Sequence, residues 1–307
     1  MSTLASTTVT VTRIGKHCGA EISGVDLSQP LDDETFAEIR DAFFENEVVF
    51  FRNQRLTPQQ QVDFTRRFGD LEHHVRKESL LAGFPEILVI SNILDEKGNA
   101  IGSQDAGRFW HSDVSYKAQP SMLSALYALE VPITKDGTVL GHTNFASSTA
   151  AYDALPDTMK QYLAGKKNVH SYRDYRRKNL EAQKEELARG GRVIQEHAVT
   201  EEQLKRVPDI DVPVVRTHPI TGRKGLFVNE GHTSGMADMP KEEGDALLAE
   251  LYRHITQPQF VYRHEWQAGD LLMWDNCAVQ HKATFDYDLP LRRLMHRTTV
   301  RGTAPFY

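Results

Sequence analysis

The residues of this chain with the clearest capacity for chemistry are a histidine and an acid two positions apart, His111 and Asp113. Random placement of the same composition would produce such a pair as often, so the spacing alone is weak evidence. The residues that follow, 114–116, have the character of a strand, and residues i and i+2 of a strand point to the same side. We therefore expect both side chains to face one metal ion.

A third ligand is available near the C-terminal end of the chain, where His281 follows a run of strand-like residues. Two imidazoles and one carboxylate on one face of an octahedron leave three positions open, a set that suits non-haem Fe(II) oxygenases. Those positions would accept an oxidisable co-substrate and O2. The alternative on spacing alone is that His111 and Asp113 are unrelated polar residues on a turn.

Two arginines, Arg293 and Arg297, lie four positions apart on a predicted strand and so share a face. The planar guanidinium of arginine recognises carboxylates and sulfonates through paired hydrogen bonds. The pair therefore predicts a site for anionic groups, although two surface arginines on a strand would have the same spacing.

The composition is that of an ordinary soluble chain, with 307 residues, 40% hydrophobic and 25% charged. This length suits either two domains or one barrel-like domain, and a chain of this size buries about 75% of its unfolded surface. A metal is thus not needed for folding, and a metal site would serve chemistry. The net charge of -6 argues against sequence-independent nucleic-acid binding, which relies on a clustered basic face.

The two cysteines, Cys18 and Cys277, cannot form a disulfide framework, so the reducing cytosol is the expected compartment. The N-terminus lacks the basic region and apolar core of a signal peptide. No apolar run approaches the ~18 residues of a membrane span. We expect a cytoplasmic protein that binds neither membrane nor nucleic acid.

Several widespread catalytic motifs are absent from the sequence. The glycine spacing rules out the GxGxxG dinucleotide fingerprint, and no Gly-Lys precedes serine or threonine as in a P-loop. Neither GxSxG, nor CxxC, nor HExxH occurs. Nucleotide-dependent, serine-hydrolase and zincin functions lose their usual support.

The elements that must position the candidate residues are short strands and a few helices. Acidic residues at 32–34 and an apolar face of Phe36, Ile39 and Phe43 predict a first helix. Thr57 as N-cap and Pro58 at the first position predict a second helix to about residue 67, and a third is expected at 241–254. Strands are expected at 9–11, 24–27, 48–51, 121–129, 141–145, 214–216, 225–228, 260–262, 270–274, 280–283 and 294–300.

Two segments differ from the rest. Residues 92–110 are punctuated by glycines and lack apolar periodicity, which predicts a long functional loop before the ligands. Residues 165–212 are rich in charge and predict a helical, largely exposed insertion within a single domain, 1–307. Many short strands with turn signals favour a sandwich or jelly roll over a parallel sheet. The expected class is mixed α+β, with flanking helices.

Together, eight sequence motifs resemble the taurine dioxygenase and 2,4-dichlorophenoxyacetate dioxygenase family of Fe(II)/2-oxoglutarate-dependent oxygenases, from about residue 10 to the end. They are GAEISGVDL at 19–27, RFGDL at 67–71, WHSD at 110–113, AAYDAL at 150–155, RTHP at 216–219, LFVNEG at 226–231, WDN at 274–276 and RRLMHR at 292–297. The resemblance implies a double-stranded β-helix, which is a jelly roll, with flanking helices.

The resemblance also assigns roles to individual residues. It implies His111, Asp113 and His281 as iron ligands. It implies that Thr143 and Arg293 bind 2-oxoglutarate, with the adjacent Arg292 as the fallback for its distal carboxylate. His74 and Arg297 match positions that hold the sulfonate in the taurine enzyme.

Three departures from the family pattern make taurine itself a doubtful substrate. The stretch 135–143, KDGTVLGHT, is longer than the family's Gly-Gly-Asp-Thr, and His142 replaces its acid. The positions near Lys77 and Gly107 do not match the side chains around the amino end of taurine.

The implied reaction couples oxidative decarboxylation of 2-oxoglutarate, to succinate and CO2, with hydroxylation of a substrate C–H bond by O2. The formal charges of Fe(II), Asp113, 2-oxoglutarate and Arg293 cancel, so Arg297 would remain as an uncompensated buried charge. An anionic substrate is therefore expected. A sulfonate or sulfate ester that releases its heteroatom group is preferred, and an aryloxyalkanoate or other carboxylate comes second.

Three rivals stay open at this point. The same scaffold could perform desaturation or decarboxylation, a non-catalytic jelly-roll protein could bind the metal, or a zinc hydrolase could use the same three ligands. Arg293 and Thr143 speak against a mere metal binder, which needs no dicarboxylate anchor. We also expect a homo-oligomer, a dimer or tetramer.

Overall fold

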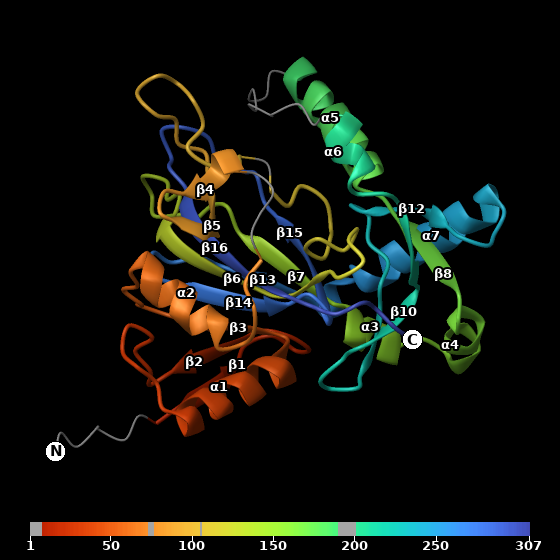
Figure 1. The fold of residues 1–307 in the computed structure, drawn as a ribbon, viewed down its shortest axis with the longest axis horizontal. Coiled ribbons are helices and arrows are strands. Elements are labelled where there is room, and N and C mark those ends of the chain that lie inside the picture. The colour runs from red at the N-terminus through yellow and green to blue at the C-terminus, as the bar shows by residue number, and fades with distance from the viewer. Residues whose placement is uncertain (1–7, 73–76, 105, 190–200) are drawn as a thin grey trace.

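The largest sheet of this computed structural model has eight strands, in the spatial order β1-β2-β3-β14-β6-β16-β5-β4 (Figure 1). The structure describes residues 8–72, 77–104, 106–189 and 201–307. Neighbouring strands are antiparallel, except that β2 and β3 are parallel. The strands are Thr10–Arg13 (β1), Ala20–Ser23 (β2), Val48–Phe51 (β3), Leu80–Leu81 (β4), Phe84–Ser91 (β5), Ser121–Glu130 (β6), Leu271–Asp275 (β14) and Leu294–Arg301 (β16).

Burial on both faces explains why the central strands are apolar throughout. In β3, Val49 and Phe51 belong to the core on one side of the sheet, whereas Val48 and Phe50 belong to the core on the other side. Because side chains alternate along a strand, a strand covered on both faces needs an unbroken apolar run. The strand expected at 48–51 is confirmed.

Two helices, α1 (Asp33–Asn46) and α2 (Pro58–Arg66), cover one face of this sheet (Figure 1). The carboxylate of Asp32 caps α1 by accepting a hydrogen bond from the main-chain N–H of Thr35 at 2.7 Å. Thr57 caps α2 in the same way, in a capping box with Gln60. Both helices are confirmed near the expected bounds, because their caps and apolar faces are local signals.

A three-stranded antiparallel sheet faces the opposite side, in the order β13-β7-β15. Its strands are β7 (Thr143–Ser147), β13 (Val261–His264) and β15 (Val279–Ala283). Phe145 and Val279 of this sheet pack in one core with Phe50 and Trp274 of the large sheet. The two sheets therefore lie face to face, and β7 and β15 carry Thr143 and His281.

The remaining elements form a second lobe beside the two sheets (Figure 1). Its strands are Lys167–His170 (β8), Ile210–Pro213 (β9), Val215–Thr217 (β10), Lys224–Leu226 (β11) and Thr233–Met236 (β12), paired as β12-β8-β9 and β10-β11. Its helices are Ser148–Asp153 (α3), Asp157–Leu163 (α4), Tyr172–Ala188 (α5), Glu201–Lys205 (α6) and Lys241–Ile255 (α7). Short 3-10 turns lie at Lys77–Ser79 and Pro258–Phe260.

Several expectations for individual elements need correction. Residues 24–27 are not a strand, because β2 ends at Ser23 and Gly24 adopts a φ of 85° that starts a turn. The segment expected as a helical insertion, 165–212, carries α5 and α6 between two strands that the sequence did not predict, β8 and β9, and Asn168 and His170 of β8 are buried. Among the described residues, no helix is long and apolar enough to cross a membrane.

Candidate active site

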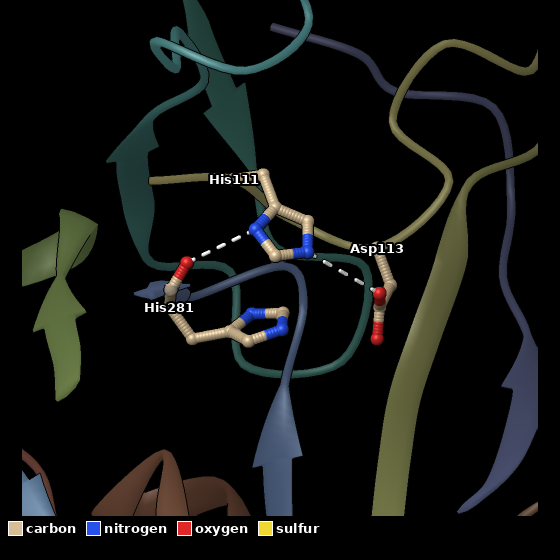
Figure 2. A group of neighbouring side chains, drawn as sticks. All are labelled: His111, Asp113 and His281. Carbon is tan, nitrogen blue, oxygen red and sulfur yellow. Dashed lines mark hydrogen bonds and ion pairs between the residues drawn. The ribbon is translucent and has the colours of Figure 1, made fainter. Parts of the chain in front are cut away.

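Three buried side chains converge between the loop 92–110 and β15: His111, Asp113 and His281 (Figure 2). Their possible ligand atoms all lie within 4.8 Å of one another. The main chains of His111 and His281 form an antiparallel bridge, with N–H···O distances of 3.1 and 2.8 Å. This bridge ties the end of the loop to β15, so the structure brings together ligands that are 170 residues apart.

The strand expected through His111 and Asp113 does not form. His111 makes its single bridge, and the chain then turns through residues 113–116, with Val114 at a φ of 58°. The i, i+2 argument for a shared face is therefore wrong. The turn nevertheless places Asp113 Oδ1 3.6 Å from His111 Nε2, so the two side chains still face each other.

The orientation of His111 leaves one ring nitrogen available for a metal. Its Nδ1 lies 2.9 Å from the carbonyl oxygen of Phe109 and 3.0 Å from that of His281 (Figure 2). Because carbonyls only accept, Nδ1 carries the proton and the Nε2 lone pair faces Asp113. A carbonyl on the distal nitrogen is the usual support of a metal-binding histidine.

The other two side chains are in the protonation states that metal binding needs. Burial, together with the neighbouring His111, lowers the pKa of His281 well below its usual value, so its imidazole is neutral. Burial alone would raise the pKa of Asp113, but the Arg297 guanidinium and His111 outweigh it and hold that pKa well below the usual range. His281 Nδ1 has no hydrogen-bond partner within the described part of the chain. Two imidazoles and one carboxylate, all buried, fit an Fe(II) ion.

Arg297 lies in β16 against the ligand cluster, but it is not the unpartnered charge that the sequence argument assumed. Its Nη1 donates to Asp113 Oδ1 at 3.0 Å, and its side chain is 11% exposed. Its Nε is buried without a partner among the described residues. One edge of the guanidinium therefore faces Asp113, and hydrogen-bonding capacity remains on the rest.

Arg293, directly before the same strand, has the character of an anion-binding residue. It is 4% exposed, and the described residues include no acidic partner for it. Its main chain is held by Asn92 and Ser91, and its guanidinium lies 6.0 Å from the Tyr287 ring. The adjacent Arg292 differs, because it is exposed and paired with Glu130 at 3.0 Å.

Thr143 begins β7 and is also buried. Its Oγ1 accepts a hydrogen bond from the indole Nε1 of Trp266 at 3.1 Å, so its own hydroxyl hydrogen can still be donated. The Tyr287 ring beside Arg293 also packs closely on Gly141, two residues before Thr143. Gly141 and Arg293 therefore border the same tyrosine, whereas His74 lies outside the described residues.

The sequence analysis missed a buried histidine on the second lobe, His232. Its ring lies 5.7 Å from that of His111, and its Nδ1 is 3.0 Å from the hydroxyl of Ser115. The rings of Tyr116 and Tyr175 pack on it, with centroids at 4.9 and 4.7 Å. The motif that ends at Gly231 is the sequence signal that could have drawn attention to this position.

The loop 92–110 is confirmed as a segment without regular strands, among the residues described there. Its C-terminal part is tied on two sides. The carbonyl of Gly107 accepts from the main-chain N–H of Ala283 at 2.9 Å, and Arg108 pairs with Glu186 of α5 at 2.7 Å. The loop thus connects the ligand strand to the second lobe.

This mixed α/β fold, with three buried candidate ligands at the edge of its paired sheets, has the donor set of non-haem metal-dependent oxygenases. A crystal structure of AAD-2 in complex with Mn(II) and N-oxalylglycine superposes with a TM-score of 0.78 at 32% identity, covering 98% of this chain and 100% of that one. The alpha-ketoglutarate-dependent 2,4-dichlorophenoxyacetate dioxygenase of Cupriavidus pinatubonensis is 35% identical over 294 residues, 93% of this chain and 95% of that protein. The alkylsulfatase of Acinetobacter baylyi is 31% identical over 287 residues, 92% of this chain and 82% of that protein.

The family model described as taurine catabolism dioxygenase TauD, TfdA family matches residues 10–299, and the chain belongs to this family. The resemblance inferred from the motifs is confirmed. With it the enzyme class is confirmed: this is an Fe(II)/2-oxoglutarate-dependent dioxygenase that uses O2.

Proposed function

We propose that this enzyme hydroxylates a small anionic organic molecule, with an alkyl sulfonate or alkyl sulfate as the first candidate substrate. The observation that carries the proposal is the position of Arg297, a nearly buried guanidinium that touches Asp113 and whose Nε has no partner among the described residues. Such a group beside a metal site favours a substrate with a negative charge.

The ligands of the iron in this proposal are His111, Asp113 and His281. When bound, Fe(II) with 2-oxoglutarate supplies the oxidising power for insertion of oxygen into a C–H bond. The protein keeps the His281 imidazole neutral and Asp113 ionised. Since Asp113 Oδ1 faces both His111 and Arg297, a bound cation would compete with Arg297 for this oxygen and free the guanidinium for substrate.

Arg293 and Thr143 are the proposed anchors of 2-oxoglutarate. A buried arginine without an acidic partner among the described residues is costly unless an anion arrives. The distal carboxylate of 2-oxoglutarate would supply that anion and accept a second hydrogen bond from the Thr143 hydroxyl. The exposed ion pair of Arg292 with Glu130 favours Arg293 over its neighbour.

For the substrate, a sulfonate or sulfate would place its oxygens against Arg297 and, by the resemblance, His74. Hydroxylation of the carbon next to the heteroatom would give an unstable product that separates into an aldehyde or oxo acid and a free anion. The relative from Acinetobacter baylyi is named an alkylsulfatase, which supports this class.

A second candidate substrate is an aryloxyalkanoate. The rings of His232, Tyr116 and Tyr175, packed edge-to-face or tilted beside His111, offer an aromatic wall, which suits an aryl group. The relative from Cupriavidus pinatubonensis is named a 2,4-dichlorophenoxyacetate dioxygenase.

Desaturation or decarboxylation on the same scaffold would be recognised from product mass.

The proposal also covers the domain organisation, the location and the assembly of the protein. We propose that the two packed sheets form the jelly roll of a single domain that includes the insertion at 165–212. The free, buried Cys18 and Cys277 support a reducing, cytoplasmic location. A dimer or tetramer is proposed for the assembly.

The deciding experiment is succinate formation with iron, ascorbate and 2-oxoglutarate, measured on a panel of sulfonates, alkyl sulfates and aryloxyalkanoates. We expect at least one anion to be turned over far better than its neutral analogues. A neutral compound turned over as well as the best anion would overturn the proposal. Stimulation by zinc in place of iron would favour a hydrolase instead.

A further inference from the structure

Asp113 is hydrogen-bonded by two side chains for which the sequence predicted no role, one at its carboxylate and one at its main-chain N–H. Ser124 in β6 places its Oγ 2.7 Å from Asp113 Oδ2. Asn276, which follows β14, accepts the main-chain N–H of Asp113 at its Oδ1, at 3.0 Å. All three residues are buried, so no solvent competes for these hydrogen bonds.

The direction of each hydrogen bond is set by groups that can only donate. The indole Nε1 of Trp274, at 3.0 Å, and the main-chain N–H of Asp113 both point at Asn276 Oδ1. The amide oxygen must therefore be that atom, and Nδ2 then faces the Ser124 hydroxyl at 3.1 Å. Ser124 accepts from Nδ2, which leaves its own hydrogen for Asp113 Oδ2.

The two carboxylate oxygens of Asp113 thus have different partners. Oδ2 accepts from Ser124 on the sheet side, whereas Oδ1 lies 3.6 Å from His111 Nε2 and 3.0 Å from Arg297 Nη1. A carboxylate can bind a metal through one oxygen or through both. In a site that must keep three positions open, a second bond from Asp113 would occupy one of them.

We propose that Trp274, Asn276 and Ser124 form a chain of positioning residues that reserves Oδ2 and keeps Asp113 a one-oxygen ligand. The chain thereby preserves the coordination position that the chelating co-substrate needs. This inference rests on the proposed function, in which Asp113 is a metal ligand. None of the three side chains is itself proposed to touch the metal or the substrate.

The test removes the hydroxyl with Ser124→Ala and compares it with Ser121→Ala. Ser121 lies on the same strand and is equally buried, but its hydroxyl has no partner among the described residues. Two readouts are taken on the purified full chain: the ligand-field absorption of the Co(II)-loaded protein, and the affinity of the Mn(II)-loaded protein for N-oxalylglycine, a dicarboxylate with an oxo-acid end. Neither readout requires turnover.

For Ser124→Ala we expect the Co(II) absorption to weaken, as it does when a ligand is added, and N-oxalylglycine affinity to fall roughly 10- to 100-fold, the usual cost of losing a partner of a metal ligand. Ser124→Thr keeps a hydroxyl and should restore both readouts. Trp274→Phe keeps a ring but removes the N–H that orients Asn276, so it should shift both readouts the same way by less. It also serves if Ser124→Ala does not fold.

Two outcomes distinguish a failure of the positioning role from a failure of the ligand assignment. If folded Ser124→Ala matches Ser121→Ala in both readouts, the positioning role is refuted while the metal centre stands. If the wild type fails to bind Mn(II), or if His281→Ala binds it as well as the wild type does, the ligand assignment and the proposed function fail together.

Discussion

The two walls of the active site are built differently. On the sheet wall, Asp113 and His281 are themselves buried, and Asp113 is held by hydrogen bonds from Ser124 and Arg297. On the second-lobe wall, α5 buries only Arg176 and Asn179, and exposed ion pairs such as Arg177 with Glu181 run along its surface. It is tied to the loop by the pair of Arg108 with Glu186 and by the main-chain N–H of Gly231, which donates to the carbonyl of Trp110 at 2.9 Å.

This difference separates two tasks. Buried hydrogen bonds to a charged group are worth about 1.5–3 kcal/mol each, whereas exposed ion pairs contribute about 0–1 kcal/mol. The sheet wall is therefore suited to hold a metal in fixed geometry. The second-lobe wall and the loop belong to the less stable part of the fold, where substrate entry and closure are expected.

The largest effect should come from breaking the sheet wall at its ligands. His111→Ala, Asp113→Ala or His281→Ala removes one of three metal ligands, so activity should be essentially lost while the fold remains. Succinate formation and circular dichroism would check both statements. Near-normal turnover by Asp113→Ala in iron would contradict the ligand assignment.

The two arginines of the sheet wall should separate co-substrate from substrate. Arg297→Gln keeps a donor for Asp113 but removes the charge, and should raise the KM for the anionic substrate about 10- to 100-fold, as expected for a hydrogen bond to a charged group. Its KM for 2-oxoglutarate should hardly change. Arg293→Ala should show the opposite pattern in the same steady-state assays.

Arg292→Ala is the matched control for this pair, because its side chain is exposed and paired with Glu130. It should leave both KM values near those of the wild type. A neutral substrate turned over as well as the best anion, with Arg297→Gln indifferent to both, would refute the role of Arg297.

A smaller effect is expected at the second-lobe wall. Residues 92–110 should gain protection from hydrogen exchange when substrate binds, because closure excludes water. Glu186→Gln removes the partner of Arg108 and should reduce that gain, with a change of only a few-fold in the substrate KM. Mass spectrometry of peptides after hydrogen exchange measures the protection of this loop.

Glu185→Gln is the control for Glu186, since Glu185 lies on the same helix in an exposed pair with Arg189. It should protect the loop as the wild type does. Equal protection of the wild-type loop with and without a saturating, turnover-competent substrate would sink the idea of closure.

A substitution at Glu47, beneath the sheet wall, should have the smallest effect on catalysis. It should have a clear effect on the stability of the protein. Burial raises the pKa of Glu47 from 4.5 to about 7, against hydrogen bonds from Thr149 and the charge of Arg223. The folded state therefore binds a proton that the unfolded state releases between about pH 4.5 and 7. Stability from this group is fully present below pH 4.5 and is lost as pH rises through about 7.

Glu47→Gln cannot titrate, so its unfolding free energy should decline less than that of the wild type between pH 4.5 and 7.5. Urea unfolding at several pH values measures the difference. Glu45→Gln, at an exposed position in α1 two residues before Glu47, should follow the wild-type profile. Parallel profiles for Glu47→Gln and the wild type would show that burial does not shift this carboxyl.

Much of the local structure could be predicted because its signals are local. Asp32 and Thr57 indicate the starts of two helices. Each side chain caps its helix by accepting a hydrogen bond from the main-chain N–H three positions later. The unbroken apolar run at 48–51 indicates a strand buried on both faces. The ligand types, His111, Asp113 and His281, were likewise readable from residue chemistry and from the motifs that carry the family resemblance.

What only the tertiary structure decided are the contacts across distant segments. The bond of Arg297 to Asp113 joins residues 184 apart, and Asn276 meets Asp113 across 163 positions. These pairings depend on the order β14-β6-β16 and on a turn at Val114 that replaced the expected strand. Local rules describe neighbours a few residues apart, whereas strand order and register arise from packing the whole chain, so the partners that tune Asp113 could be seen only in the folded protein.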